Sequence, residues 1–208
     1  MNFNDFKNKI SQLKTTELGG LNAQFKLAPK IRLKYDADKI TANNPRKAAV
    51  LALFYPNLKN ETCFLLTQRA SYKGIHSAQI SFPGGKKDIE DENLEKTALR
   101  ETFEEVGVTE ASIEIIRELT DVYIPPSNFL ATPFLGYANQ QPNFNLNYEV
   151  EQTIEVLLRD LLSETNFTAI KMNTSYMEDV EVPCFKLDGY IVWGATAMML
   201  SEIKELFK

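Results

Sequence analysis

The most informative stretch of this sequence is Ala-Leu-Arg-Glu-Thr-Phe-Glu-Glu-Val-Gly-Val at residues 98–108, which follows the run Phe-Pro-Gly-Gly at residues 82–85. The segment at 98–108, together with the residues just before it, predicts a helix over residues 94–106. Gly107 is expected to end this helix, because glycine readily takes the left-handed conformation that follows many helices. A glycine turn followed by a charged helix is therefore the centre of the predicted domain.

Three glutamates of this helix are predicted to share one face. Glu101 and Glu105 are four residues apart and Glu104 is three residues after Glu101, a spacing that places side chains next to one another on a helix. The apolar residues are expected on a different face, packed into the core: Leu99, Phe103 and Val106.

These carboxylates indicate a metal site. Three carboxylates on one helix face repel each other, so either solvent screens them or a divalent cation lies among them. Oxygen ligands favour Mg²⁺ or Mn²⁺, with substrate phosphates completing the coordination. The alternative is a solvated acidic face on which Arg100 pairs with Glu104 four residues later.

The N-terminal part of the chain predicts one helix and a long loop. Phe3, Phe6, Ile10 and Leu13 recur at helical spacing, which predicts an amphipathic helix over residues 2–14. A loop-like segment is expected from there to about residue 46.

Short apolar runs predict a domain of mixed strands and helices. Residues 48–54 and 62–67 are expected to form a hairpin around the polar turn at 56–60. The other expected strands lie near residues 113–123, 131–138, 153–156, 167–171 and 182–186, and the other expected helices at 156–163 and 193–207.

Composition restricts the partners and the location. The 208-residue chain has 23 Lys+Arg against 28 Asp+Glu, a net charge of -5, so nucleic acid is not an expected partner. No apolar run approaches the ~20 residues of a membrane span, so no membrane contact is expected. Cys63 and Cys184 lie in apolar runs and are predicted to be buried, reduced thiols. Charges near the N-terminus, where a signal peptide needs an apolar core, favour a cytoplasmic protein.

The turn and helix resemble the Nudix box, whose usual form is G-x5-E-x7-R-E-U-x-E-E-x-G-U, with U apolar. Residues 100–108 match its second half, with Thr102 in an apolar position. In the first half Glu92 stands at the glutamate position, while Gly85 lies one residue early. The string Phe-Pro-Gly-Gly-Lys-Lys-Asp-Ile-Glu-Asp at residues 82–91 resembles the coenzyme A pyrophosphatase branch, which has this offset.

A second string resembles the same branch. It comprises Leu-Leu-Thr-Gln-Arg-Ala at residues 65–70, then His76, Gln79 and the Phe-Pro-Gly-Gly turn. The sequence departs from the branch at Gly74, where a basic residue is common, and at Ala78, where glycine is common. Two later segments are also similar to it, residues 132–136 and 191–197.

The resemblance implies the Nudix fold, an α+β fold in which a mixed β-sheet lies between helices in an α/β/α sandwich. Residues 46–208 would form the Nudix hydrolase domain. Residues 1–45 would form an N-terminal helix and extension packed on that domain. The apolar stripe of the first helix is expected in the core or in a self-association face, which would make a homodimer.

The resemblance also implies where the metal binds. The expected ligands of Mg²⁺ or Mn²⁺ are Glu101, Glu104, Glu105 and the carbonyl oxygen of Gly85. Arg100 is expected to orient these carboxylates without touching the metal. Asp91 and Glu92 are expected to cap the helix or to hold Arg100.

The implied substrate contacts lie around the glycine turn. The residues expected to bind substrate are Arg69, His76, Gln79 and Lys86. Arg69 is the favoured phosphate ligand, because a guanidinium donates two parallel hydrogen bonds to phosphate oxygens. The proton of the attacking water would pass to one of three glutamates, Glu101, Glu104 or, in a later polar loop, Glu149.

The activity that the resemblance implies is hydrolysis of the diphosphate of coenzyme A or acyl-CoA. The products would be 3′,5′-ADP and 4′-phosphopantetheine, or its acylated form. One alternative is a Nudix hydrolase of another nucleoside diphosphate derivative, such as ADP-ribose or NADH. The other is a catalytically silent Nudix-like binding module, against which the intact carboxylates at positions 101, 104 and 105 argue.

Overall fold

A computed structural model describes residues 1–70, 79–174 and 177–208. Its larger sheet contains β1 (Arg46–Pro56), β2 (Thr62–Arg69), β3 (Ile80–Ser81), β4 (Gly84–Lys86), β5 (Glu114–Glu118), β6 (Val122–Ile124), β7 (Phe129–Tyr137) and β8 (Val150–Leu157). A smaller antiparallel sheet contains β9 (Phe167–Thr174), β10 (Met177–Leu187) and β11 (Tyr190–Trp193).

The helices are α1 (Phe3–Thr15), α2 (Gly20–Gln24), α3 (Ala37–Ala42), α4 (Leu94–Val106), α5 (Leu158–Leu162) and α6 (Gly194–Leu206). Short 3₁₀ helices lie at Phe25–Leu27, Lys30–Lys34, Glu110–Ser112, Pro125–Ser127 and Glu164–Asn166. The predicted helix over 94–106 is confirmed, and Gly107 ends it with a left-handed φ of 75°.

Strand β1 is the centre of the larger sheet, which is mixed. It pairs parallel with β7 and antiparallel with β2 and β4. The predicted hairpin between the first two strands is therefore confirmed. Strand β2 pairs with the end of β1, and β4 pairs with the start of β1. The glycine turn therefore joins the same sheet as the hairpin.

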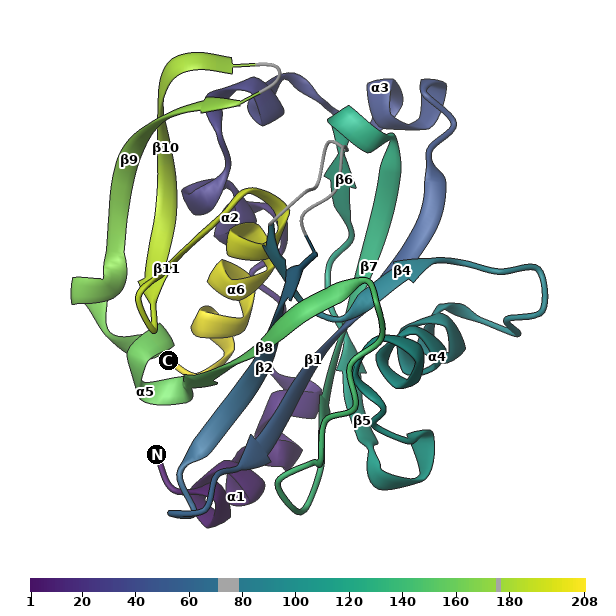
Figure 1. Cartoon of the computed structure of the whole chain (residues 1–208). Coiled ribbons are helices and arrows are strands. Elements are labelled where there is room, and N and C mark those ends of the chain that lie inside the picture. Colours follow the sequence, from purple (N-terminus) through teal and green to yellow (C-terminus); the bar gives the residue numbers. More distant parts are fainter. Residues whose placement is uncertain (71–78, 175–176) are drawn as a thin grey trace.

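Both faces of β1 are buried, so its side chains alternate between two cores. Leu51 and Leu53 pack in one cluster with Leu99 of α4. Ala52 and Phe54 pack in the other cluster, which contains residues of α1 and α6. Figure 1 shows α4 and α6 on opposite sides of these strands. The molecule is thus an α/β/α sandwich around a mixed sheet, as expected.

The N-terminal segment is more ordered than the sequence indicates. Phe3, Phe6 and Leu13 of α1 are buried in the core of their own chain, which confirms the expectation that this stripe packs into the core. The expected loop contains α2 and α3, which short local periodicity does not reveal. Gln24 donates a hydrogen bond to the carbonyl of Thr120 at 2.8 Å, and such long-range contacts hold these short helices.

Three other expectations need correction. The strand expected over 113–123 is two strands, β5 and β6, which both pair with β7 but in different registers. Strands β3, β4 and β11 were not expected, because two to four residues carry no periodicity and form only through pairing with distant strands. Phe103 is 52% exposed rather than in the core. The core-facing position belongs to Thr102, whose hydroxyl donates to the carbonyl of Ala98 at 2.7 Å.

Both cysteines are buried and unpaired, as expected. Burial raises the pKa of the Cys63 thiol to about 12 and also raises that of Cys184. Within the described ranges, no helix is long and apolar enough to cross a membrane.

Candidate active site

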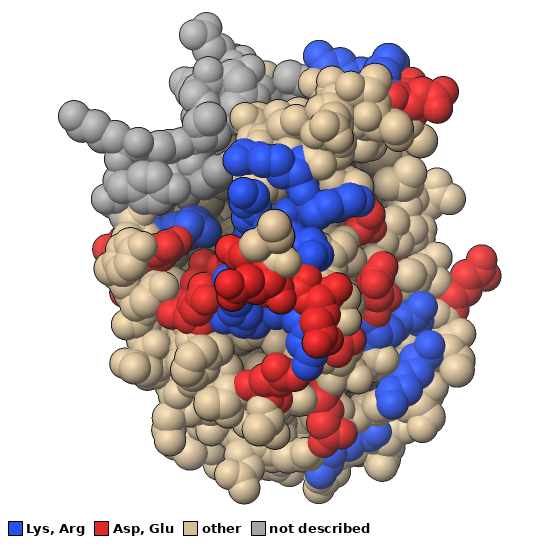
Figure 2. Space-filling model, turned by 90° about the vertical axis from the view of Figure 1, so that its right-hand side faces the viewer, with Lys and Arg blue, Asp and Glu red and all other residues tan. Residues whose placement is uncertain are grey.

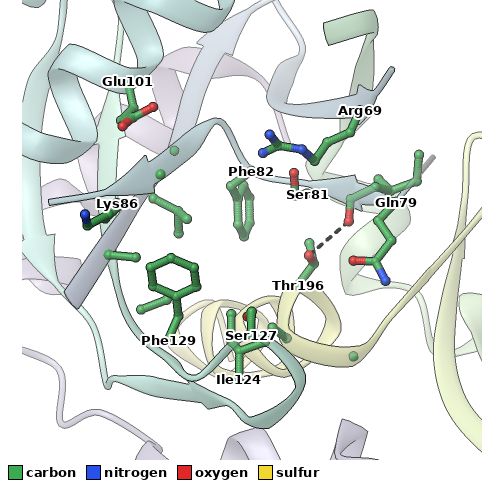
Figure 3. Close-up of a pocket in the computed structure, with 18 of the residues that line it drawn as sticks. Arg69, Gln79, Ser81, Phe82, Lys86, Glu101, Ile124, Ser127, Phe129 and Thr196 are labelled. Carbon is green, nitrogen blue, oxygen red and sulfur yellow. Dashed lines mark hydrogen bonds between the residues drawn. The ribbon is translucent and has the colours of Figure 1, made fainter. Parts of the chain in front are cut away.

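A cavity of about 440 Å³ lies between the glycine turn, the start of α6 and the connection from β6 to β7. Its polar residues include Arg32, Arg69, Gln79, Lys86, Glu101, Glu105 and Glu149, and its apolar residues include Ala48, Val50, Phe82, Ile124, Phe129, Ala131 and Trp193. In Figure 3, Glu101 lies at the upper left and Arg69 at the upper right, Ile124 and Ser127 lie at the bottom of the view, and Lys86 and Thr196 lie between these levels. The carboxylates and Arg69 thus lie at one end of the cavity, apolar residues form much of its wall, and Arg32 also lines it.

The two glycines of the turn fit α4 closely against the sheet. A Cβ atom at Gly84 would lie 2.3 Å from the carbonyl oxygen of Ala49 in β1. A Cβ atom at Gly85 would lie 2.6 Å from the carboxylate atoms of Glu101. No side chain fits at either position without displacement of its neighbours. The glycines thus let the backbone of the turn approach a carboxylate of α4.

Glu105 is the most buried carboxylate of the cavity, with 4% of the residue exposed. Its Oε2 accepts a hydrogen bond of 3.1 Å from the backbone N–H of Gly84, and its Oε1 lies 3.5 Å from Nη1 of Arg69. Burial raises the pKa of Glu105 to about 7, against the opposing effects of Arg69 and the Gly84 N–H. Near neutral pH this side chain therefore holds its negative charge only weakly.

Arg69 bridges two carboxylates at the end of β2. Its Nη2 donates to Oε2 of Glu149 at 2.9 Å, while Nη1 faces Glu105. Glu149 comes from the loop before β8, and its carbonyl accepts a hydrogen bond from the N–H of Ala70 at 2.8 Å. The pairing of β2 with β8 thus brings into one cavity residues that lie 80 positions apart.

The three clustered glutamates of α4 differ in exposure. The side chain of Glu104 is 50% exposed, that of Glu101 is 17% exposed, and that of Glu105 is 5% exposed. Burial raises the pKa of Glu101, and the positive charge of Arg100 opposes this. Figure 2 shows acidic side chains gathered across the face that carries α4, with basic side chains directly above them. Glu101 and Glu105 line the cavity, and Glu104 lies outside it.

Arg100 connects α4 to the loop after the glycine turn. Its Nε and Nη2 donate to the carboxylate of Asp91 at 2.9 and 3.0 Å, and its Nη1 donates to Glu101 and Glu104 at 3.0 Å each. Arg100 holds the pKa of Asp91 well below its usual range. Asp91 thus holds Arg100, as expected, whereas Asn93 rather than Asp91 or Glu92 caps the helix by accepting from the N–H of Lys96.

The donors at the charged end fit a hard divalent cation in their chemistry. They are carboxylate and carbonyl oxygens, and two of them, Glu101 and Glu105, have pKa values raised by burial, which a bound cation would reverse. Among residues 1–70, 79–174 and 177–208, no group of three or more acidic, histidine or cysteine side chains is arranged to hold a metal ion. Instead Arg69 and Arg100 neutralise these carboxylates.

Most of the sequence-predicted site residues lie around this one cavity. Those that line it are Arg69, Gln79, Gly85, Lys86, Glu101, Glu105 and Glu149. His76, Gly74 and Ala78 lie outside the described residues. The sequence did not indicate Arg32 or Phe129 as cavity residues. Arg32 reaches the cavity through a contact with Tyr123, 91 positions away, and no local pattern predicts such a contact.

The chain is similar to proteins of one family. A model of the NUDIX domain matches residues 45–169. Proteins described as the uncharacterized Nudix hydrolase NudL from Yersinia pestis (strain Pestoides F) and from Yersinia pseudotuberculosis serotype O:1b (strain IP 31758) are each 27% identical over 166 residues. In both cases this is 79% of this chain and 81% of the relative.

A solved structure supports the fold. The crystal structure of a MutT/nudix family protein from Enterococcus faecalis matches with a TM-score of 0.52 at 17% identity, over 85% of this chain and 71% of that one. At this identity the likeness concerns the fold alone, and it agrees with the expected mixed sheet between helices. Since the NUDIX model covers more than half of the sequence, and includes the glycine turn and the carboxylates of α4, this chain belongs to the Nudix family and is a hydrolase that acts on pyrophosphate bonds.

Proposed function

We propose that this Nudix hydrolase cleaves the diphosphate of coenzyme A or acyl-CoA, to give 3′,5′-ADP and 4′-phosphopantetheine or its acylated form. One observation carries the proposal. Arg69, Gln79 and Phe82 belong to the string that resembles the coenzyme A pyrophosphatases, and they line the same cavity as Glu101 and Glu105 of the Nudix box. A substrate at the carboxylates would therefore touch the residues of that string.

The shape of the cavity agrees with a substrate of two chemical characters. A volume of about 440 Å³ is in the range of pockets that bind small molecules. The end with the carboxylates and Arg69 suits a diphosphate, and the apolar wall beside it suits a flat base or an aliphatic chain. Coenzyme A offers all three groups.

The cofactor in this proposal is Mg²⁺ or Mn²⁺. Its ligands would be Glu101, Glu105 and the carbonyl oxygen of Gly85, with Glu104, which lies outside the cavity, as a further ligand. When bound, such an ion neutralises charge on the diphosphate and lowers the pKa of a coordinated water. Arg100 orients Glu101 and Glu104 through the hydrogen bonds that it donates to both.

The chain's own residues bind the diphosphate and take up a proton. Arg69 donates to phosphate oxygens from its place between Glu105 and Glu149, and Lys86 adds positive charge at the same end. Gln79 supplies an amide that can donate or accept a hydrogen bond. The carboxylate of Glu149 accepts the proton from the attacking water, with Glu101 and Glu104 as the other candidates. Residues 1–45 belong to the same folded unit as the catalytic domain at 46–208.

Product analysis tests the proposal. The purified protein is incubated with coenzyme A and Mg²⁺ or Mn²⁺, beside ADP-ribose and NADH, with a chelator control. Metal-dependent formation of 3′,5′-ADP is the expected result. Turnover of ADP-ribose or NADH with coenzyme A left intact would overturn the substrate assignment and keep the carboxylate site. Turnover that persists in the chelator would overturn the cofactor.

A further inference from the structure

A cation from outside the matched NUDIX segment lines the cavity. Arg32 lies in the 3₁₀ helix Lys30–Lys34, whereas the NUDIX model begins at residue 45. Its Nη1 donates to the carbonyl oxygen of Tyr123 at 2.8 Å and lies 3.6 Å from the sulfur of Met198. These two contacts, with β6 and α6, fix the guanidinium at the wall of the cavity.

Arg32 lies on the wall away from the carboxylates. Tyr123, which accepts its hydrogen bond, directly precedes Ile124. A Cβ atom at Gly194 would lie 4.0 Å from Nη2 of Arg32. In Figure 3, Ile124 lies at the bottom of the view, opposite Glu101 and Arg69 at the top. The carboxylates that line the cavity, Glu101, Glu105 and Glu149, thus belong to the other end.

The wall between the two ends is apolar. The residues that form it are Val50, Phe82, Phe129 and Ala131. The guanidinium of Arg46 stacks on the ring of Phe129, 4.1 Å from its centroid, and adds positive charge near the same wall. A ligand that spans the cavity would therefore meet cations and carboxylates at one end, an aromatic ring in the middle and an arginine at the other end.

We infer that Arg32 binds a second phosphate of the substrate, separate from the diphosphate that is cleaved. This rests on the proposed function, and in coenzyme A the group is the 3′-phosphate of the ribose. The apolar wall between the two ends would then contact the adenine base. Arg32 is thus a specificity-determining residue that favours 3′-phosphorylated nucleotides, because a guanidinium matches the geometry of phosphate oxygens.

Binding of two nucleotides that differ only in the 3′-phosphate tests this inference. Adenosine 3′,5′-bisphosphate and AMP are titrated by calorimetry into the wild-type protein in buffer with Mg²⁺. The wild type is expected to bind the bisphosphate about 10- to 100-fold more tightly, the range of hydrogen bonds to a charged group. Arg32→Gln should reduce this preference to less than about 3-fold, with little change for AMP.

Two further variants keep the test sharp. Lys34→Gln removes an exposed charge of the same 3₁₀ helix and should leave the preference unchanged. Arg32→Lys keeps the charge but loses the two-pronged geometry, and should reduce the preference by at least about 3-fold even where Arg32→Gln does not fold. A wild type without preference would overturn the inference. So would an Arg32→Gln protein that binds both nucleotides equally less well, because that result indicates a structural role.

The same readout separates this inference from the proposed function. Kinetics with coenzyme A and 3′-dephospho-coenzyme A are measured beside the titrations. If neither is hydrolysed, the proposed function fails, while the nucleotide preference still reports on Arg32. If both are hydrolysed at equal rates and the bisphosphate binds no better than AMP, the function stands and the inference fails.

Discussion

Asp91 and Glu105 are two carboxylates at the same helix whose side chains have the same exposed fraction, but their surroundings move their pKa values in opposite directions. Both side chains are 5% exposed. Asp91 accepts hydrogen bonds from Nε and Nη2 of Arg100, from the hydroxyl of Thr97 and from the N–H of Asp88. Its pKa is held well below the usual range, whereas burial raises that of Glu105 to about 7.

The number of donors and the depth of burial, which is greater at Glu105, together explain the difference. Asp91 has a donor for most of its lone pairs, so its charge is more favourable in the folded protein than in water. Within the part of the chain that the structure describes, the Glu105 carboxylate accepts one hydrogen bond, from the N–H of Gly84, and shares Arg69 with Glu149. Arg100 and Asp91 thus form a fully hydrogen-bonded structural pair, whereas the charged form of Glu105 would be stabilised by a further cation. The exposed fraction of a carboxylate alone therefore does not distinguish a structural acid from a candidate metal ligand.

The largest effect is expected from Glu105→Gln. The variant keeps the size of the side chain and removes the charge that would hold the metal, so kcat/KM should fall by more than about 100-fold. Residues that only orient metal ligands already cost 10- to 100-fold. Steady-state kinetics with Mg²⁺, beside circular dichroism to check the fold, measures this. Near wild-type turnover would show that Glu105 is not a ligand.

The same variant should stabilise the metal-free protein above neutral pH. The pKa of Glu105 rises from 4.5 in the unfolded chain to about 7 in the folded one, so ionisation costs stability progressively between these values and fully above pH 7. Glu105→Gln removes that cost, which is at most about 3 kcal/mol at 1.4 kcal/mol per pKa unit. Urea unfolding in chelator at pH 4 and pH 8 should show a gain only at pH 8. A gain of equal size at both pH values would contradict this origin.

Asp91→Asn should have the opposite sign. Asparagine loses the charge that faces Arg100, and we expect the free energy of unfolding to fall by about 1 to 3 kcal/mol at pH 7, since Arg100 is partly exposed. The contribution of Asp91 is complete above its unfolded pKa of 3.8 and is lost as the pH falls through the lower folded value. The difference between variant and wild type should therefore shrink below about pH 4. A difference independent of pH would refute the ion pair as its cause.

Gly85→Ala should reduce activity by displacing the carboxylate of Glu101. The new Cβ atom would lie 2.6 Å from the Glu101 carboxylate, so this side chain has to move away from the turn. We expect about a 10-fold fall in kcat/KM, with a change in unfolding free energy of less than about 1 kcal/mol. The matched control is Gly189→Ala, where nothing lies within 4 Å of the new atom. Because Gly189 has a left-handed φ, we expect this control to lose a little stability but no activity.

Local sequence patterns were sufficient for the parts of the fold that local physics determines. The helix at 94–106, its glycine end and the hairpin of β1 and β2 each follow from a few adjacent residues. The resemblance to the Nudix family and to its coenzyme A pyrophosphatase branch implied the sandwich and pointed to Glu149 and Arg69, which the pairing of β2 with β8 brings together.

What the sequence missed depends on distant contacts. Strand β4 exists because Gly84 and Gly85 pair with β1, and Arg32 reaches the cavity because β6 supplies its hydrogen-bond partner. The expectation that Phe103 is buried failed for a different reason. A buried threonine that donates to its own helix can fill an apolar position, so the core face of α4 lies one residue away from the most apolar side chain.

Phe103→Ala should have the smallest effect and serves as a control for the other substitutions at α4. The ring is 52% exposed, and alanine has the higher helix propensity. The change in unfolding free energy should therefore be within about 0.5 kcal/mol, and kcat/KM should stay within about 2-fold. Thermal unfolding and the coenzyme A assay measure both. If Phe103→Ala lowers the free energy of unfolding by more than about 1 kcal/mol, the ring makes contacts in solution that this structure does not show. Packing around α4 would then contribute to the effects of the Asp91 and Glu105 variants as well as their own hydrogen bonds.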